Sequence, residues 1–151
     1  MRFVTAVIAT AMLMTFSLAY GQETKKDAKE EGHEHQTVEK KFVATVGADG
    51  IQHIDMVGGE YYFDPNVIVV KVNVPVELKV KKAAGYVPHD IVADSPDAGI
   101  KFKSDINSKE PAVIKFTPTK VGTYPLYCDK QLLFFKSHRE RGMEGKIVVV
   151  D

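Results

Sequence analysis

The sequence has very little cysteine: Cys128 is the single one among its 151 residues. An intramolecular disulfide is therefore excluded, although exported proteins ordinarily pair their cysteines. The simplest explanation of a lone thiol is a small buried apolar side chain, and the more specific one is a bond to a metal ion. The residues that accompany Cys128 decide between the two.

The chain also lacks an excess of charge of either sign. Its 20 basic and 20 acidic residues give a formal net charge of zero, so there is no general electrostatic reason to expect nucleic acid or an anionic membrane as a partner. Glycine-rich phosphate loops, Cys-x-x-Cys pairs and Gly-x-Ser-x-Gly turns are absent from the sequence. Their absence excludes the enzyme classes that depend on them. The single cysteine likewise excludes a binuclear copper centre of the oxidase type, which needs two bridging cysteines.

Charged residues are missing from the apolar stretch 3–20, which follows a positively charged start. Small residues at Ala19 and Gly21 precede a cleavage point before Gln22, as in a secretory signal peptide. The alternative is a transmembrane anchor, because the stretch approaches the roughly 20 residues that span a bilayer. The position of the stretch at the N-terminus and the small residues at its end favour cleavage. We therefore expect residues 1–21 to be a signal peptide, and the protein to be periplasmic or otherwise exported, without membrane insertion after cleavage.

Residues 22–41 are almost wholly polar and carry charges of both signs. Such a segment buries too little apolar surface to offset the entropy lost on ordering, so we expect a disordered leader. His33 and His35 lie within it. We interpret them as parts of a solvated linker, with weak collection of metal ions as the alternative.

From residue 42 to 151 the sequence consists of short β-branched and aromatic runs separated by Gly, Pro, Asn and Asp. The alternation of Val76, Leu78 and Val80 with charged neighbours predicts a half-buried strand. No helix of three turns is expected, and residues 129–142 have room for one or two turns. About eight strands in this length predict one all-β domain, a Greek-key antiparallel β-sandwich. The expected strands are 42–46, 51–57, 67–72, 76–82, 89–93, 112–117, 121–127 and 145–150.

Three segments of this domain carry residues that bind metals. Pro88 restricts the backbone before His89, which opens a strand. Cys128 stands at the end of another strand, and His138 and Met143 follow it before the last strand. Two imidazoles, a thiolate and a weak axial thioether form the ligand set of a blue-copper site. The sequence therefore predicts one copper ion that alternates between Cu(I) and Cu(II), with zinc as the chemical alternative.

The same segments resemble the cupredoxins, the family of plastocyanin, azurin and pseudoazurin, over about residues 60–151. The stretch VPHDIVADSPDAGIKF is similar to the segment with the family's first histidine, and VGTYPLYCD…H…GMEGKIVVV is similar to its C-terminal ligand hairpin. The resemblance implies an eight-stranded Greek-key sandwich, a mononuclear copper site and one-electron transfer between redox partners. It also implies that the copper ligands are His89, Cys128, His138 and Met143.

Two features depart from the family pattern. The nine residues Asp129–Ser137 lie between the ligand cysteine and the second ligand histidine, where the family has a shorter loop. They include the apolar run Leu132–Phe135, which we expect to be buried in support of the ligand loop. If exposed, this run would form an apolar docking patch beside the copper. The second departure is Asp90, at a position where the family often has an asparagine that ties the ligand loops together.

Other residues have weaker claims to a functional role. Strand alternation places His53 on a polar face, so we interpret it as a solvated side chain. Glu60 precedes an aromatic run in a loop that approaches the metal in related folds, and as a ligand it would give a red-copper site. Cys128 and His138 also form the pair that a cysteine hydrolase needs. A cysteine at a strand end, near Met143 and a second histidine, fits copper better.

We therefore expect a periplasmic electron carrier, not an enzyme. Its partners would be redox proteins such as cytochromes, oxidases or reductases, met in transient complexes by a monomer. One alternative is a copper carrier or buffer, assisted by His33 and His35. The other is an enzyme with an open or carboxylate-ligated copper, whose activity would not depend on Met143.

Overall fold

The computed structural model describes residues 38–151. The predicted signal peptide at residues 1–21 lies outside the described residues, as do positions 22–37 of the predicted leader with His33 and His35. No helix in the described part has the length and apolarity needed to cross a membrane. Its strands are β1 (Lys41–Val43), β2 (Gln52–Gly59), β3 (Tyr62–Asp64), β4 (Val67–Lys71), β5 (Val76–Lys82), β6 (His89–Ser95), β7 (Ile100–Ile106), β8 (Ala112–Phe116), β9 (Gly122–Tyr127) and β10 (Glu144–Val150). Its helices are the short 3₁₀ turns η1 (Pro96–Ala98) and η2 (Arg139–Arg141).

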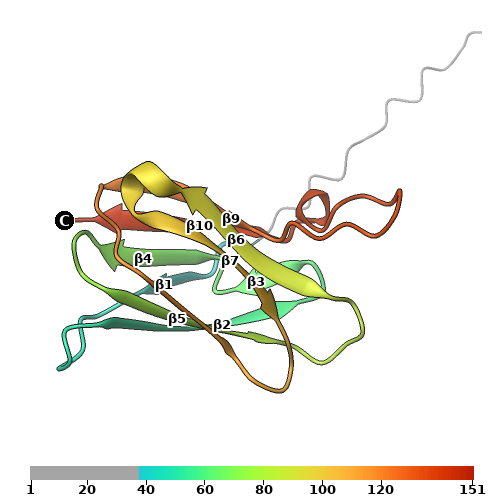
Figure 1. The fold of residues 1–151 in the computed structure, drawn as a ribbon, viewed down its shortest axis with the longest axis horizontal. Helices are drawn as coiled ribbons and strands as arrows, with labels where there is room; N and C mark the ends of the chain where they lie inside the picture. Colours follow the sequence, from blue (N-terminus) through green and yellow to red (C-terminus); the bar gives the residue numbers. More distant parts are fainter. Residues whose placement is uncertain (1–37) are drawn as a thin grey trace, which may run out of the picture. The chain divides into compact units, whose positions relative to one another are not determined.

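Two β-sheets pack against each other around one apolar core (Figure 1). One sheet has the strand order β1-β4-β10-β9-β6-β7, and the other has the order β3-β2-β5-β8. Strands that follow one another in the chain change sheets, as β4, β5 and β6 do, and these crossovers are typical of a Greek-key sandwich. The predicted all-β sandwich is confirmed.

The strand pairing is mixed, whereas the sequence analysis predicted an antiparallel arrangement. β4 runs parallel to both β1 and β10, and β2 runs parallel to β5. Between β2 and β5 the chain crosses to the opposite sheet, where it forms β4. Because of this crossover, β5 can run in the same direction as β2. The pairs of β3 with β2, β8 with β5, β9 with β10, and β6 with both β7 and β9 are antiparallel.

Two strands were missed by the sequence analysis, β3 and β7. β7 buries Ile100 and Ile106 and turns Lys101 and Lys103 to solvent. Its many charged residues concealed this alternation. β3 has three residues and forms a hairpin with β2. The other expected strands are present with ends shifted by one or two residues, or by three at β1, and β5 has the predicted bounds.

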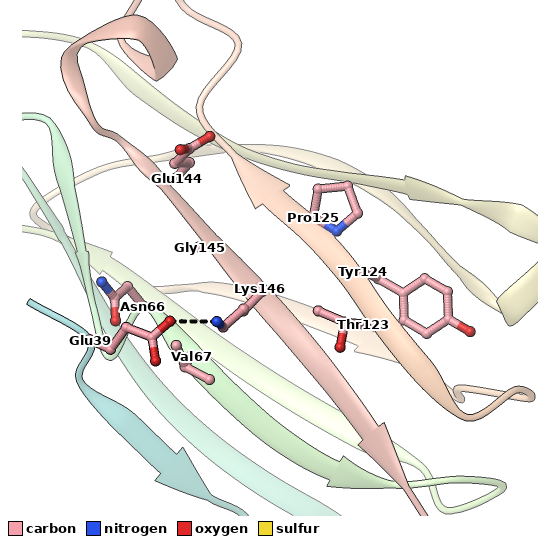
Figure 2. A pocket seen from close by; sticks show the side chains of 9 residues that line it. All are labelled: Glu39, Asn66, Val67, Thr123, Tyr124, Pro125, Glu144, Gly145 and Lys146. Carbon is pink, nitrogen blue, oxygen red and sulfur yellow. Dashed lines mark hydrogen bonds and ion pairs between the residues drawn. The ribbon is translucent and has the colours of Figure 1, made fainter. Parts of the chain in front are cut away.

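The first described residues run beside β4 and β10 (Figure 2). The N–H of Lys40 donates to Oδ1 of Asn66 at 2.8 Å, and the carboxylate of Glu39 pairs with the ammonium of Lys146. Because β1 starts at Lys41, the described fold includes the last residues of the segment predicted as leader. A groove of about 440 Å³ opens here. Its lining residues are Glu39, Asn66, Val67, Thr123, Tyr124, Pro125, Glu144, Gly145 and Lys146.

The strand register brings the ends of three strands together at one end of the sandwich. β6 begins at His89, and its Val92 pairs with Tyr127, the last residue of β9. Tyr127 also pairs with Glu144, the first residue of β10. The end of β9 therefore lies between β6 and the start of β10, and the loop that joins β9 to β10 reaches the start of β6.

Candidate metal centre

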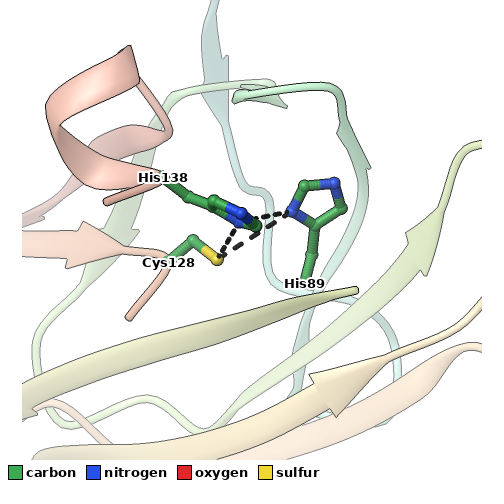
Figure 3. A group of neighbouring side chains, drawn as sticks. All are labelled: His89, Cys128 and His138. Atoms are coloured by element: carbon green, nitrogen blue, oxygen red, sulfur yellow. Dashed lines mark hydrogen bonds between the residues drawn. The ribbon is translucent and has the colours of Figure 1, made fainter. Parts of the chain in front are cut away.

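Three of the four predicted ligands meet at this end of the sandwich (Figure 3). The Nδ1 atoms of His89 and His138 are 3.0 Å apart. Sγ of Cys128 is 3.4 Å from Nδ1 of His138 and 4.0 Å from Nδ1 of His89. Within residues 38–151, no other group of three His, Cys, Asp or Glu side chains converges in this way. The arrangement presents two nitrogens and one sulfur to a common point.

All three side chains are withdrawn from solvent. Cys128 is fully buried, and His89 and His138 are each 3 % exposed. Burial lowers the pKa of His89 to about 4, assisted by the nearby His138 and by the charge of Lys82. Burial also lowers the pKa of His138, assisted by Arg141. Both imidazoles are therefore neutral at pH 7, the form in which histidine binds metals.

The thiol of Cys128 is protonated in the protein without metal. Burial raises its pKa to about 11, and the carboxylate of Asp90 adds to the rise, while hydrogen bonds from the backbone of Asp90 and Lys130 oppose it. A buried anion without a counter-ion is unfavourable, and a metal cation in contact with the sulfur supplies that counter-ion. Binding of a metal ion would therefore displace one proton, from Cys128.

Asp90 ties the two ligand segments together. Its backbone N–H points at Sγ of Cys128 at 3.5 Å, and its Oδ1 accepts a hydrogen bond from the N–H of Asp129 at 2.7 Å. Its Oδ2 is buried without a hydrogen bond, but it lies 3.7 Å from the ammonium of Lys103 and 4.0 Å from that of Lys130. An aspartate thus makes the contact between loops for which the family often has an asparagine.

The backbone of Met143 forms hydrogen bonds to the two predicted ligands that precede it in the chain, Cys128 and His138. Its N–H donates to the carbonyl of His138 at 2.9 Å, and its carbonyl accepts from the N–H of Cys128 at 3.0 Å. The side chain is fully buried, and a Cβ added at Gly58 would lie 3.4 Å from its Cε and 2.5 Å from Cδ1 of Ile106. Gly58 therefore leaves the space beside the Met143 methyl group that a larger residue would fill.

The nine residues Asp129–Ser137, which we call the insert, do not open the ligand loop, the connection between β9 and β10 that carries Cys128 and His138. The N–H of His138 donates to the carbonyl of Lys130 at 2.9 Å, so the chain leaves and rejoins the ligand loop at adjacent points. The expectation that Leu132–Phe135 would be buried is wrong, because the insert projects beyond the sandwich (Figure 1) and no described element covers it. The exposed fractions are 61 % for Leu132, 74 % for Leu133, 88 % for Phe134 and 50 % for Phe135.

Tyr61 is a site residue that the sequence analysis missed. Its ring contacts the ring of His138 edge-on, with centroids 5.1 Å apart, and that of His89 at 6.2 Å. The guanidinium of Arg141 lies 4.7 Å from the Tyr61 ring on which it stacks. Tyr61 occupies the β2–β3 turn with a φ of 61°, a left-handed conformation that costs a non-glycine residue about 1 kcal/mol or more. The tyrosine contacts both histidines, whereas in this loop the sequence analysis had considered only Glu60 as a site residue.

The other candidates do not join the cluster. Glu60 is exposed in the turn before Tyr61 and is not among the converging side chains. His53 is exposed on β2, where its Nε2 lies 2.7 Å from Asp49 and its Nδ1 lies 3.5 Å from Glu77. The interpretation of His53 as a solvated strand residue is confirmed.

A pocket of about 360 Å³ opens beside His138. We call it the His138 pocket. It lies between the β5–β6 loop, the β2–β3 turn and the insert. Its lining residues are Tyr61, Tyr86, Val87, Pro88, Lys130, Gln131, Leu132, Lys136, His138 and Arg141. Of the three clustered side chains, His138 is the one that lines this pocket.

Comparison with known proteins agrees with this fold. The family model of the cupredoxin-like domain matches residues 7–149. A comparison with curated protein sequences finds no match.

Similar solved structures include the metal-binding domain of the Cu(I)-exporting P-type ATPase CopA of Streptococcus pneumoniae D39, solved with Cu(I). It is 21 % identical, with a TM-score of 0.57, and the match covers 74 % of this chain and 97 % of that one. A copper-binding protein solved in its apo form is 22 % identical, with a TM-score of 0.54 and coverage of 73 % and 97 %. Auracyanin A, a blue copper protein of Chloroflexus aurantiacus, is 21 % identical, with a TM-score of 0.51 and coverage of 67 % and 100 %. At these identities the shared property is the fold.

Proposed function

The chain belongs to the cupredoxin-like domain family, and from this premise we propose that it binds one copper ion and transfers single electrons between redox partners. The observation that carries the proposal is the meeting of two imidazole nitrogens and one thiol sulfur within 4.8 Å of one another. The donors come from separate segments, at His89, Cys128 and His138, and each is at most 3 % exposed.

The donor set fits copper. Thiolate sulfur suits Cu(I), and imidazole suits both oxidation states. His89, Cys128 and His138 would hold the ion, and Met143 is the proposed weak fourth ligand from the same loop. When bound, the copper supplies a one-electron couple. The two neutral imidazoles and the thiolate together carry one negative charge, which would neutralise Cu(I) fully and Cu(II) in part inside the apolar core.

The surrounding residues keep the donors in place. The N–H of Asp90 stabilises the sulfur, and its carboxylate holds the loop after Cys128. The hydrogen bonds of Met143 hold the segment that carries His138. A site fixed in this way moves little between oxidation states, and small reorganisation favours fast electron exchange. Burial of the donors also keeps water away from them.

The division of the chain into segments and its location in the cell are part of the proposal. We place a signal peptide at residues 1–21, a leader at 22–41 and the copper domain at 42–151. The mature protein would act as a periplasmic monomer. The apolar stretch at 3–20 and the small residues after it support export.

An enzyme has less support than a carrier of electrons. A copper enzyme needs a coordination position that a small molecule reaches, whereas the donors here are buried beneath Tyr61. Glu60, the carboxylate that would convert the site to a red-copper centre, is exposed and outside the cluster.

The experiment that tests the proposal is voltammetry of the copper-loaded protein with and without a Cu(I) chelator. An electron carrier gives a reversible one-electron wave that persists in the chelator. Rapid loss of the wave, together with copper transfer to an apo acceptor, would replace the proposal with that of a copper carrier. Absence of a wave in a copper-loaded sample would reject electron transfer.

A further inference from the structure

Four consecutive apolar side chains stand in solvent at the tip of the insert. We call Leu132–Phe135 the apolar tip. Single exposed apolar residues are ordinary, but a contiguous group marks a surface that meets another molecule. The rings of Phe134 and Phe135 also lie against each other, with centroids 5.7 Å apart. The tip therefore presents one apolar surface.

The tip is held in shape by the insert itself. The N–H of Phe135 donates to the carbonyl of Leu132 at 3.0 Å, and Nε2 of Gln131 donates to the carbonyl of Phe135 at 2.9 Å. Because the bond between Lys130 and His138 already closes the ligand loop, the residues between them are not needed to bring the donors together. They extend the copper end of the molecule outward.

The tip and the metal centre share a cavity. Leu132 lines the His138 pocket on the insert side, and Tyr86, which is fully exposed, lines it on the side of the β5–β6 loop. His138 borders the same cavity. A side chain that enters the pocket comes next to a proposed copper ligand, which is the position required for electron exchange through that imidazole.

The charged side chains that line the pocket are of one sign. Lys130, Lys136 and Arg141 line it, and no carboxylate does. Lys130 is paired with Asp105 at 2.7 Å. Among the described residues, Lys136 and Arg141 have no carboxylate within 4.0 Å. Two cationic groups are thus available to an anionic partner.

We propose that the apolar tip and the His138 pocket form the docking face for a redox protein whose contact surface carries an exposed apolar group ringed by carboxylates. This inference rests on the proposed electron transfer and names the partner's chemistry. The cations would attract the partner and orient it, and the apolar tip would bury surface in the complex. A protein fits better than a lipid bilayer, because the face includes a concave pocket, which a protruding side chain of a partner would enter and the flat surface of a bilayer would not.

The test measures second-order electron-transfer rates between the copper-loaded protein and two soluble cytochromes in stopped flow. One cytochrome has a haem edge ringed by carboxylates, and the other has an edge ringed by lysines. The first should react faster at low salt, and its rate should fall about tenfold as salt is raised. Equal rates and equal salt dependence for the two cytochromes would overturn the proposal.

Matched variants locate the face. Lys136→Glu should slow the carboxylate-ringed cytochrome about threefold or more at low salt, and Leu133→Ser with Phe134→Ser should slow it at every salt concentration. The controls are Lys109→Glu for charge and Val113→Ser with Val121→Ser for exposed apolar surface, all outside the pocket lining. Rates in the tip and Lys136 variants that match those of the controls would reject this docking face.

Two further measurements distinguish loss of docking from loss of the copper site, and a protein partner from a membrane surface. Each variant should keep the visible spectrum of the parent protein and a reversible one-electron wave, so loss of docking is distinguished from loss of the copper site. Sedimentation with phosphatidylglycerol vesicles tests the lipid alternative. Vesicle binding that disappears in the tip variant would overturn the proposal in favour of a membrane surface.

Discussion

The backbone N–H of His138 donates to the carbonyl of Lys130 at 2.9 Å, and this bond brings together the two ends of the long insert. The consequence is that the seven residues between the two partners have little influence on the donor positions. Although nine residues separate it from Cys128, His138 therefore reaches the same cluster that a shorter loop would reach.

Shortening the insert tests this relationship. Replacement of Leu132–Phe135 by two glycines should leave copper stoichiometry and the visible spectrum unchanged, because the bond between Lys130 and His138 does not involve the replaced residues. The measurement is copper titration followed by absorption spectroscopy, with far-UV circular dichroism as the control for folding. A folded variant that has lost copper binding would show that the insert shapes the centre.

Asp90 should be important for stability through its contact with Asp129. Asp90→Ala leaves the N–H of Asp129 without its acceptor and should lower the free energy of unfolding by about 1–3 kcal/mol in urea titrations. Asp90→Asn keeps an oxygen acceptor and should lose less. Removal of a negative charge beside the sulfur in Asp90→Asn should also raise the reduction potential. Equal stability of the Ala and Asn variants would contradict the assigned contact.

Tyr61 should restrict access to the metal centre. Tyr61→Ala removes the ring that packs on both histidines, so copper release to a chelator should accelerate by about two- to tenfold, since a lost aromatic contact corresponds to roughly 0.5–1.5 kcal/mol. Tyr62→Ala, at the exposed neighbouring position, is the matched control. Equal release rates in the two variants would show that the ring does not cover the centre.

The stability of the metal-free protein should depend on pH through His89. Its pKa is lowered from 6.5 to about 4 in the folded protein, so the unfolded chain binds more protons between these values. The free energy of unfolding should therefore rise with pH from about 4 to 6.5 and level off above, by on the order of 3 kcal/mol for this group. Urea titrations at several pH values measure it. In His89→Asn this part of the slope should vanish, and an unchanged slope would contradict the assignment to His89.

Much of the fold was predictable because its signals are local. The alternation of Val76, Leu78 and Val80 marks β5 without knowledge of its neighbours, and all three side chains are buried as expected. The donors were predictable in the same way, since His89 follows Pro88 and opens a strand and Cys128 ends one. The structure brings these donors together with His138, and ligation by Met143 stays a prediction.

The features that escaped prediction depend on what lies across space. The apolar run Leu132–Phe135 suggested burial, but the sequence does not state whether any element lies over it, and none of the described ones does. Tyr61 reaches the histidines because the turn before β3 places it in a left-handed conformation. Neighbouring residues give no sign of that conformation, which a non-glycine residue seldom adopts.

The visible and EPR spectra of the Cu(II)-loaded protein, beside a Cys128→Ser variant, test the central claim most directly. A copper site built from His89, Cys128 and His138 predicts an intense thiolate-to-copper absorption band in the visible and a narrow copper hyperfine splitting. Both should be lost in the serine variant, which keeps the imidazoles and removes the sulfur. A copper-loaded parent protein without a thiolate band would contradict the claim that Cys128 binds the metal.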